Sequence, residues 1–216
     1  MLTSALAFAG VAALINITPG LDTLLVLRTS VSQGRTAGLA SALGILTGCV
    51  VWGIATAVGL TALLTASRFA YDTLRIAGAA YLVWLGASAL WRSRRAAGDE
   101  SSQVPGAFAE AEPRGRWAAF RAGVGTNLLN PKAGVFYMSL IPQFTPHGES
   151  VFTMTLLLTA IDIVELAIWY WVVSGAASAL ADRLRRPAFR RRMEQVSGIA
   201  FFGFAANLLA DRGRAA

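Results

Sequence analysis

The chain has 216 residues, a net charge of +7 at pH 7, and a composition that is 55% hydrophobic and only 14% charged. This balance is typical of an integral membrane protein and excludes a soluble basic domain. It also argues against nucleic-acid binding, because the arginines are concentrated in the connections between apolar stretches and are not spread over one binding face.

Six apolar stretches are each about as long as the roughly 20 residues that are needed to cross a bilayer. They cover approximately residues 2–28, 37–66, 69–92, 118–142, 150–181 and 193–211. The sequence therefore predicts an all-α integral membrane protein with six transmembrane helices. The first stretch has the apolar, small-residue composition of a signal peptide, but no basic residue precedes Arg28. We therefore predict that this stretch is retained as a membrane span.

One long polar segment, 93–117, mixes both signs of charge with glycine, proline and serine, and we expect it to be a cytoplasmic linker. It divides the chain into residues 1–92 and 118–216, each of which contains three predicted spans. Because each half has an odd number of spans, the two halves run through the membrane in opposite directions. The predicted architecture is therefore a 3+3 inverted repeat.

The first span of each half has an asparagine followed by a proline near its middle, in 16-NITPGL-21 and 127-NLLNPKA-133. Proline removes a helical hydrogen bond and clashes with the preceding turn, so we expect the first and fourth helices to be broken in mid-membrane at these prolines. Thr18 and Asn130 precede the prolines and are good N-caps, and proline is favoured at the first helical position. The pattern predicts that a helix begins again at each break.

The arginines are distributed unevenly between the two sides of the predicted bundle. Connections 28–36, 92–121 and 182–192 are rich in arginine, whereas the connections on the opposite side contain few. By the positive-inside rule, the arginine-rich connections face the cytoplasm and both termini lie outside.

The region around the second span contains two G-x-x-x-G motifs, at 34–38 and 44–48. Such motifs allow two helix backbones to approach closely. Three uses remain open, namely packing within the chain, a sliding surface during a conformational change, and a homodimer.

The two predicted helix starts meet near the membrane midplane in this topology. Each has unpaired N–H groups and about half a positive charge, so together they predict a site for a carboxylate. Glycine after the first proline allows the backbone to approach a ligand closely. We expect the substrate to bind the residues at the two breaks, namely Asn16, Thr18, Pro19, Gly20, Asp22, Asn127, Asn130, Pro131 and Lys132.

Lys132 is the only lysine in the chain, and it lies in an apolar run directly after a proline. The candidate anions are Asp22, which follows the first break, and Asp162 and Glu165, which share one face of the fifth span. An ionisable side chain at the bilayer centre costs at least about 2.5–3.5 kcal/mol, which favours a functional role. Two interpretations remain open. One is an ion pair of Lys132 with Asp162 or Glu165 that holds two spans together, and the other is a substrate site with these three carboxylates as candidate proton-coupling groups.

Cys49 and His147 are the only cysteine and the only histidine, which excludes an intramolecular disulfide and a His/Cys metal site. We expect no cofactor, we interpret Cys49 as a packing residue, and we assign no site role to Trp169, Tyr170 or Trp171. A membrane-embedded enzyme or redox carrier is one alternative, but it would need a paired thiol, a histidine cluster or a nucleophile with its base. A passive channel is the other alternative, although buried charges of both signs suit a gated carrier better.

The segments NITPGLDTLLVLRTSVSQGRTAGLASALGILTG (16–48) and GVGTNLLNPKAGVFYMSLIPQF (123–144) resemble the LysE/RhtB family of amino-acid exporters. The resemblance covers essentially the whole chain in length and span order, and it differs at Leu21, where the family often has a second proline. It implies a multi-pass protein of the bacterial inner membrane that exports small amino acids or their derivatives. Export would use the proton gradient and alternating access, and the RhtB-like motif favours substrates similar to homoserine or threonine. In such a site, Asp22 is the first candidate for binding the ammonium group of the substrate.

Overall fold

The computed structural model describes residues 2–18, 20–67, 115–145 and 149–177, together with single residues beyond these ranges. The described residues form helices and their connections, and none of them lies in a strand, as expected for the all-α class. Several predicted features lie wholly or almost wholly outside the described residues, namely the spans 69–92 and 193–211, most of the linker, Pro19 and His147.

The N-terminal part of the chain forms α1 (Leu2–Ile17) and α2 (Leu21–Gln33), whose axes differ in direction by 53°. Helix α3 (Arg35–Ala66) follows after a single residue, Gly34. The backbone of Gly34 has φ 86°, a conformation that glycine adopts without the steric cost that other residues pay. The predicted connection 28–36 is therefore wrong in its extent, because the chain reverses at one glycine and α2 continues to Gln33.

The next described helix is α5 (Arg116–Leu128), so the last two residues of the predicted linker, Arg116 and Trp117, belong to a helix. A helical run then begins after Asn130 and consists of α6 (Pro131–Val135), the π-helical segment η1 (Phe136–Leu140) and the 3-10 segment η2 (Ile141–Phe144). Ser150 is the N-cap of helix α7 (Val151–Gly175), and its hydroxyl accepts a hydrogen bond from the Thr153 N–H at 3.3 Å.

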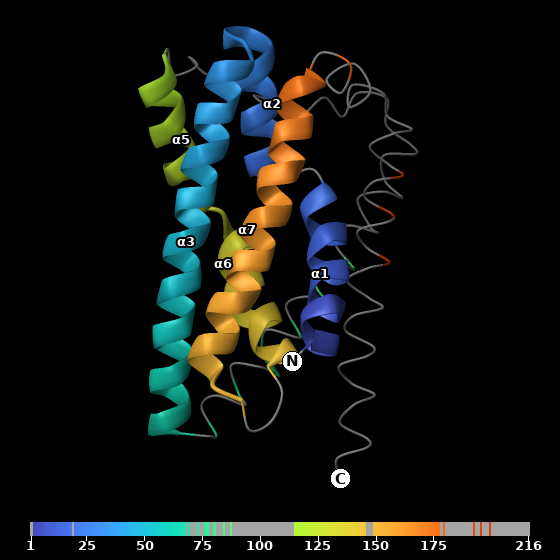
Figure 1. Cartoon of the computed structure of the whole chain (residues 1–216). Coiled ribbons are helices and arrows are strands. Elements are labelled where there is room, and N and C mark those ends of the chain that lie inside the picture. Colours follow the sequence, from blue (N-terminus) through green and yellow to red (C-terminus); the bar gives the residue numbers. More distant parts are fainter. Residues whose placement is uncertain are drawn as a thin grey trace.

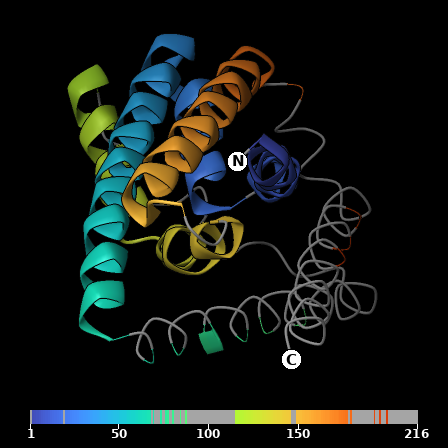
Figure 2. The same cartoon turned by 60° about the horizontal axis from the view of Figure 1, so that its bottom comes forward.

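Helices α3 and α7 are each long and apolar enough to cross a membrane, and α1 with α2 adds a third span if the bent pair is taken as one. In Figure 1, α3 and α7 run side by side, with α5 along α3 and α1 along α7. Figure 2 shows the run of α6, η1 and η2 between α3 and α1. Elements from distant parts of the sequence therefore enclose the middle of the bundle, while the number of six spans and the inverted repeat stay predictions.

Two glycines allow α3 and α5 to approach closely. A methyl group at Gly44 would overlap the carbonyl of Phe120 on α5, and one at Gly123 would overlap the carbonyl of Ser41 on α3. The second G-x-x-x-G motif thus serves packing within the chain. In the first motif only Gly38 serves helix packing, because a methyl group there would overlap Ser30 on α2, whereas Gly34 lies at the turn before α3.

An aromatic cluster holds α1 against the run that follows α6. The ring of Phe8 lies 5.9 Å from that of Phe136 and 5.5 Å from that of Phe144, measured between ring centroids. Phe8 is far in the sequence from Phe136 and Phe144, which belong to the consecutive segments η1 and η2, and Phe8 is completely buried. This packing brings the C-terminal end of α1 close to the polar residues described below.

Candidate functional site

A cavity of about 50 Å³ lies where α1, α2, α3, α5, α6, η1 and α7 meet. A volume of this kind holds a few water molecules, since one water needs roughly 10–15 Å³. The polar side chains that line the cavity are Asn16, Thr18, Asp22, Thr23, Cys49, Asn127, Asn130, Lys132, Tyr137, Asp162 and Tyr170. Ionisable groups of both signs therefore share one small space inside the bundle.

Asn130 and Pro131 explain why a helix begins just before Lys132. Asn130 has an extended backbone, and its Oδ1 accepts a hydrogen bond from the backbone N–H of Lys132 at 3.0 Å. This is the geometry of an N-cap, and Pro131 occupies the first turn, where a backbone N–H has no helical partner to lose. The side chain of Lys132 then lies on the wall of the cavity.

The ammonium group of Lys132 is bound by the C-terminal end of α1. Its Nζ donates hydrogen bonds to the backbone carbonyls of Ile15 at 2.9 Å and Thr18 at 3.3 Å. The last carbonyls of a helix lack helical partners and carry partial negative charge, so a cation is favourable there. No carboxylate among the described residues lies within ion-pair distance of Nζ. The first of the two interpretations left open by the sequence, an ion pair of Lys132 with Asp162 or Glu165, is therefore wrong, and the substrate site stays a prediction.

Asp22 lies in the first turn of α2, where its carboxylate faces α5. Its Oδ2 accepts a hydrogen bond from Asn127 Nδ2 at 2.9 Å. Within the described part of the chain, the other oxygen, Oδ1, is buried and has no hydrogen-bond partner. A buried acceptor without a donor is costly, so this oxygen is the atom in the cavity that most requires one.

Asn127 is held in place from several directions. It is 1% exposed, its Nδ2 also lies 3.5 Å from the sulfur of Cys49, and its carbonyl accepts a hydrogen bond from Trp52 Nε1 at 3.4 Å. Gly48 on α3 provides the room for it, because a methyl group at that position would overlap the Asn127 side chain. The orientation of Asp22 thus depends on residues of α3 and α5.

Asp162 lies in the middle of α7 and is only 1% exposed. Its Oδ1 accepts a hydrogen bond from Asn16 Nδ2 at 2.9 Å, and its Oδ2 accepts one from the Tyr137 hydroxyl at 2.8 Å. Both oxygens are therefore satisfied by donors, one from α1 and one from η1. This arrangement is what a buried carboxylate needs in order to carry its charge.

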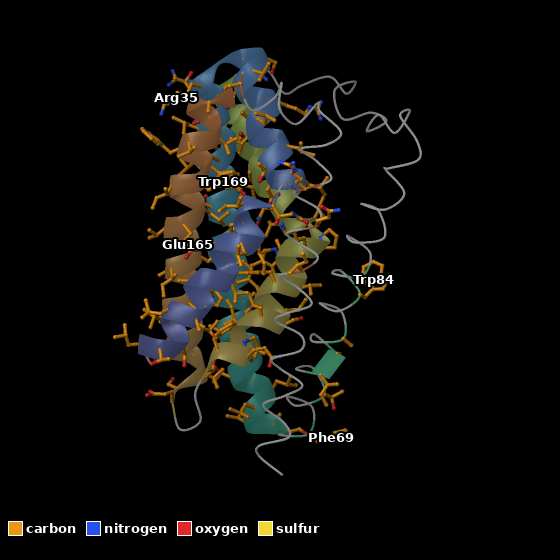
Figure 3. All side chains as sticks on the ribbon, turned by 90° about the vertical axis from the view of Figure 1, so that its right-hand side faces the viewer. Arg35, Phe69, Trp84, Glu165 and Trp169 are labelled. Atoms are coloured by element: carbon orange, nitrogen blue, oxygen red, sulfur yellow. The ribbon has the colours of Figure 1, made fainter. Side chains whose placement is uncertain are left out.

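The structure brings most of the predicted site residues together. Asn16, Thr18, Gly20, Asp22, Asn127, Asn130, Lys132 and Asp162 all line the cavity. Pro131 starts α6 but is not part of the lining, and Pro19 lies outside the described residues. Glu165 lies one turn beyond Asp162 on α7 (Figure 3) and is also absent from the lining. Its Oε2 is buried and has no hydrogen-bond partner among the described residues.

Several residues of the cavity wall were not predicted from the sequence. Thr23 and Tyr137 were not considered, and Cys49 was interpreted as a packing residue. Tyr170 was given no role, yet it is 3% exposed and lines the cavity. Its position eight residues after Asp162, two helical turns on the same face, was a signal that could have identified it. Tyr137 had a weaker signal, because it is one of two hydroxyl residues, with Ser139, in an otherwise apolar run.

The arrangement suits a small ligand that carries both charges. Its lining residues offer an ammonium group, a buried carboxylate oxygen that has no donor among the described residues, and several hydroxyl or thiol groups. Among the described residues, no group of three or more His, Cys, Asp and Glu side chains is placed to hold a metal ion.

Comparisons with known proteins give matches that cover most of the chain. A family model described as "LysE type translocator" matches residues 13–212. The chain is 30% identical over 199 residues to the homoserine/homoserine lactone efflux protein of Salmonella typhimurium, covering 92% of each chain. It is 31% identical over 200 residues to the threonine efflux protein of Escherichia coli K12, covering 91% of this chain and 92% of the relative. It is 26% identical over 201 residues to the Bacillus subtilis "Uncharacterized membrane protein YrhP", covering 93% and 96%. No solved structure matches the chain significantly.

Proposed function

Since the chain belongs to the LysE type translocator family, we propose that it exports small amino acids or their derivatives across the bacterial inner membrane. The observation that carries this proposal is the juxtaposition of the Lys132 ammonium group and the open Asp22 carboxylate oxygen in one cavity. A free amino acid at neutral pH has one carboxylate and one ammonium group, so it is complementary to this pair. The protein acts as a carrier and not as an enzyme, in keeping with the efflux activities named for its relatives.

The substrate carboxylate binds between Lys132 and the N-terminal end of α2. Gly20 is the N-cap of α2 and gives no side-chain hydrogen bond, so the first N–H groups of that helix are available to a ligand. A methyl group at Gly20 would lie 3.7 Å from Lys132 Nζ, which places the lysine beside this helix start. The third hydrogen of the ammonium group, which neither Ile15 nor Thr18 accepts, completes the site for the carboxylate.

The substrate ammonium group binds Asp22. Its Oδ1 lacks a donor among the described residues, and an ammonium group would supply one together with a charge of opposite sign. Asn127 holds the other oxygen of the same carboxylate, so the acceptor is oriented before the substrate arrives. The remaining predicted site residues, Asn16, Thr18 and Asn130, shape the wall around this pair.

Substrates similar to homoserine or threonine are favoured. Two relatives are named for homoserine and threonine efflux, and Thr23, Cys49 and Tyr137 place polar groups on the cavity wall that suit a hydroxyl-bearing side chain. The cavity has room for only a few waters, so a bulky side chain would require more expansion than a short one.

Transport follows an alternating-access cycle that is coupled to protons. Two halves, 1–92 and 118–216, form an inverted repeat joined by the linker 93–117, and their first helices are broken at prolines in mid-membrane. Both termini lie outside. A proton enters from the outside on Asp22, Asp162 or Glu165 as the substrate leaves, which couples export to the proton gradient.

The test uses everted membrane vesicles from cells with and without this protein. An imposed proton gradient and a mixture of all amino acids plus homoserine are supplied, and the accumulated compounds are identified by mass spectrometry. We expect homoserine or threonine to accumulate, and a protonophore to abolish the accumulation. Equilibration that a protonophore does not change would identify a passive channel. No enrichment, with the protein confirmed in the membrane, would refute amino-acid export.

A further inference from the structure

We propose that Asp162 is the carboxylate that carries the coupling proton and that its protonation releases the C-terminal end of α1. This inference rests on the proposed function and names one of its three candidate carboxylates. It follows from how the end of α1 is held, from the chemistry of the two hydrogen bonds on Asp162, and from the different positions of Asp22 and Glu165.

The C-terminal end of α1 is held by hydrogen bonds on two sides of the cavity. Asn16 donates its side-chain amide to Asp162 on α7 at 2.9 Å. On the other side, the carbonyls of Ile15 and Thr18 accept hydrogen bonds from Lys132 on α6. These contacts hold the part of α1 that forms one wall of the cavity, so breaking one of them frees a wall of the substrate site.

The contacts of Asp162 depend on its charge. An ionised carboxylate only accepts hydrogen bonds, and here each oxygen accepts one, from Asn16 and from Tyr137. Protonation places a hydrogen on one oxygen, so that this oxygen becomes a donor while the neighbouring N–H or O–H group is also a donor. Either the Asn16 amide or the Tyr137 hydroxyl must therefore turn away or reverse its role. The negative charge that faces Lys132 across the cavity is lost in the same step.

Asp22 is a less suitable coupling group because one of its oxygens is needed by the substrate. Among the described residues only Oδ2 has a hydrogen-bond donor, Asn127, and Oδ1 is the acceptor proposed for the substrate ammonium group. A proton on Asp22 would compete directly with that ammonium group. Glu165 is less suitable because it does not line the cavity and, among the described residues, interacts with the wall through Asn16 alone, whereas Asp162 holds both Asn16 and Tyr137.

Several titratable groups lie around Asp162. Those on neighbouring elements are Asp22 on α2, Cys49 on α3, Lys132 on α6 and Tyr137 on η1, and those on α7 itself are Glu165 and Tyr170. Helix α1 presents an amide, Asn16, and no charged group. Among these groups, Asp162 is the carboxylate whose two oxygens are both bound to elements other than its own.

The proton step is balanced and needs no other reactant. One proton from the outside forms an O–H bond on Asp162 as the substrate departs outward. When the cavity opens to the cytoplasm, that O–H bond breaks and the proton leaves inward, which restores the carboxylate and its two acceptor sites. One amino acid moves out and one proton moves in during each cycle.

The experiment separates substrate exchange from proton-driven transport in proteoliposomes that contain the purified full-length protein. Exchange of radiolabelled threonine or homoserine at equal pH on both sides needs no net proton movement, whereas accumulation against a gradient does. We expect Asp162→Asn to lose accumulation driven by a pH difference while exchange continues. Asp22→Asn should lose both activities. Gly59→Ala, where a methyl group would meet no atom within 4 Å and which does not line the cavity, should keep both.

Accumulation by Asp162→Asn at the wild-type level would overturn the proposal, and so would loss of its exchange in protein that is inserted and folded. Wild-type protein that neither exchanges nor accumulates either probe would instead refute the proposed function, and the coupling role with it.

Tyr137→Phe provides a second test that does not remove the carboxylate. The variant keeps the ring but deletes one donor to the charged form of Asp162. We expect the midpoint of the pH dependence of export to move upward by about one pH unit, the size expected for loss of one hydrogen bond to a charged group. An unchanged pH midpoint, with only a lower rate, would show that Tyr137 is structural and would overturn the role of Asp162.

Discussion

The side-chain amide of Asn16 donates a hydrogen bond to the carboxylate of Asp162 at 2.9 Å, although the two residues are 146 positions apart in the chain. This contact joins the C-terminal end of α1 to the middle of α7. Because Lys132 holds the same end of α1 from the opposite side, three polar residues together define one wall of the cavity. Substitutions in this wall, or in the residues that support it, are therefore expected to change export, substrate binding or stability.

Replacing Lys132 should abolish export without preventing membrane insertion. The Lys132→Met variant keeps a long apolar side chain but loses two hydrogen bonds to the end of α1 and the cation for the substrate carboxylate. Hydrogen bonds of charged groups are each worth about 1.5–3 kcal/mol, so we expect a fall in export of at least about tenfold. Uptake into everted vesicles measures the effect, normalised to the amount of protein in the membrane. Export at the wild-type rate would show that Lys132 has no part in transport.

Gly48→Ala should impair export because the new methyl group would displace Asn127. The overlap involves Asn127 atoms near its backbone as well as its amide, so the side chain cannot simply rotate away. Overpacking of this kind typically costs about 1–3 kcal/mol, which corresponds to a reduction in substrate affinity of roughly tenfold or more. Affinity for threonine or homoserine in detergent solution would measure it.

The matched control is Gly59→Ala on the same helix, where a methyl group would meet no atom within 4 Å. This control should bind like the wild type. Equal binding by both variants would contradict the supporting role assigned to Asn127.

Gly123→Ala should destabilise the protein, because the methyl group would overlap the Ser41 carbonyl and push α5 away from α3. Backbone cannot yield as a flexible side chain does, so we expect a loss of about 1–3 kcal/mol in the free energy of unfolding. Thermal unfolding in detergent provides the measurement. Gly125→Ala lies on the same helix in open space and should leave the melting temperature unchanged or slightly raised.

Cys49 should report occupancy of the cavity. It is the only cysteine of the chain and lines the cavity wall, although it is just 2% exposed. Methyl methanethiosulfonate would add a methylthio group to a cavity of about 50 Å³, so we expect it to block export. A transported amino acid should slow this labelling in proportion to the fraction of protein that it occupies.

The Cys49→Ala variant is the control for this labelling. It should resist the reagent and keep most of its export, because a thiol is a weak hydrogen-bonding group, here 3.5 Å from Asn127 Nδ2 and beside the Tyr137 hydroxyl. Labelling that is insensitive to every transported amino acid would place the substrate elsewhere.

Part of the fold could be predicted because it depends on local patterns. Apolar stretches of sufficient length predict membrane helices from composition alone, and α3 and α7 have the expected hydropathy. The start of α6 also follows from neighbours in sequence, since Asn130 caps the helix that begins at Pro131. The exact ends were less predictable. The single-residue turn at Gly34 could not be distinguished from a longer polar connection, because flanking polar residues can continue a helix as well as end it.

The candidate site was predictable wherever an unusual residue stood out against an apolar background. Asp22, Lys132 and Asp162 are costly in a membrane wherever they lie, so the sequence alone marked them as candidates. Tyr137, Tyr170 and Cys49 are ordinary in such a setting, and nothing in their own surroundings distinguished them from packing residues.

The sequence by itself determined the membrane class, the positions of the polar residues within apolar stretches and the local start of α6, because each depends on residues within a few turns of one another. Only the tertiary structure decided which partners those residues have. Lys132 binds the carbonyls of α1 and not a carboxylate, and Asp162 receives donors from α1 and η1. The reason is that hydrogen bonds between distant segments depend on how the helices pack, and that packing in turn depends on small residues such as Gly44, Gly48 and Gly123 at the points of closest approach.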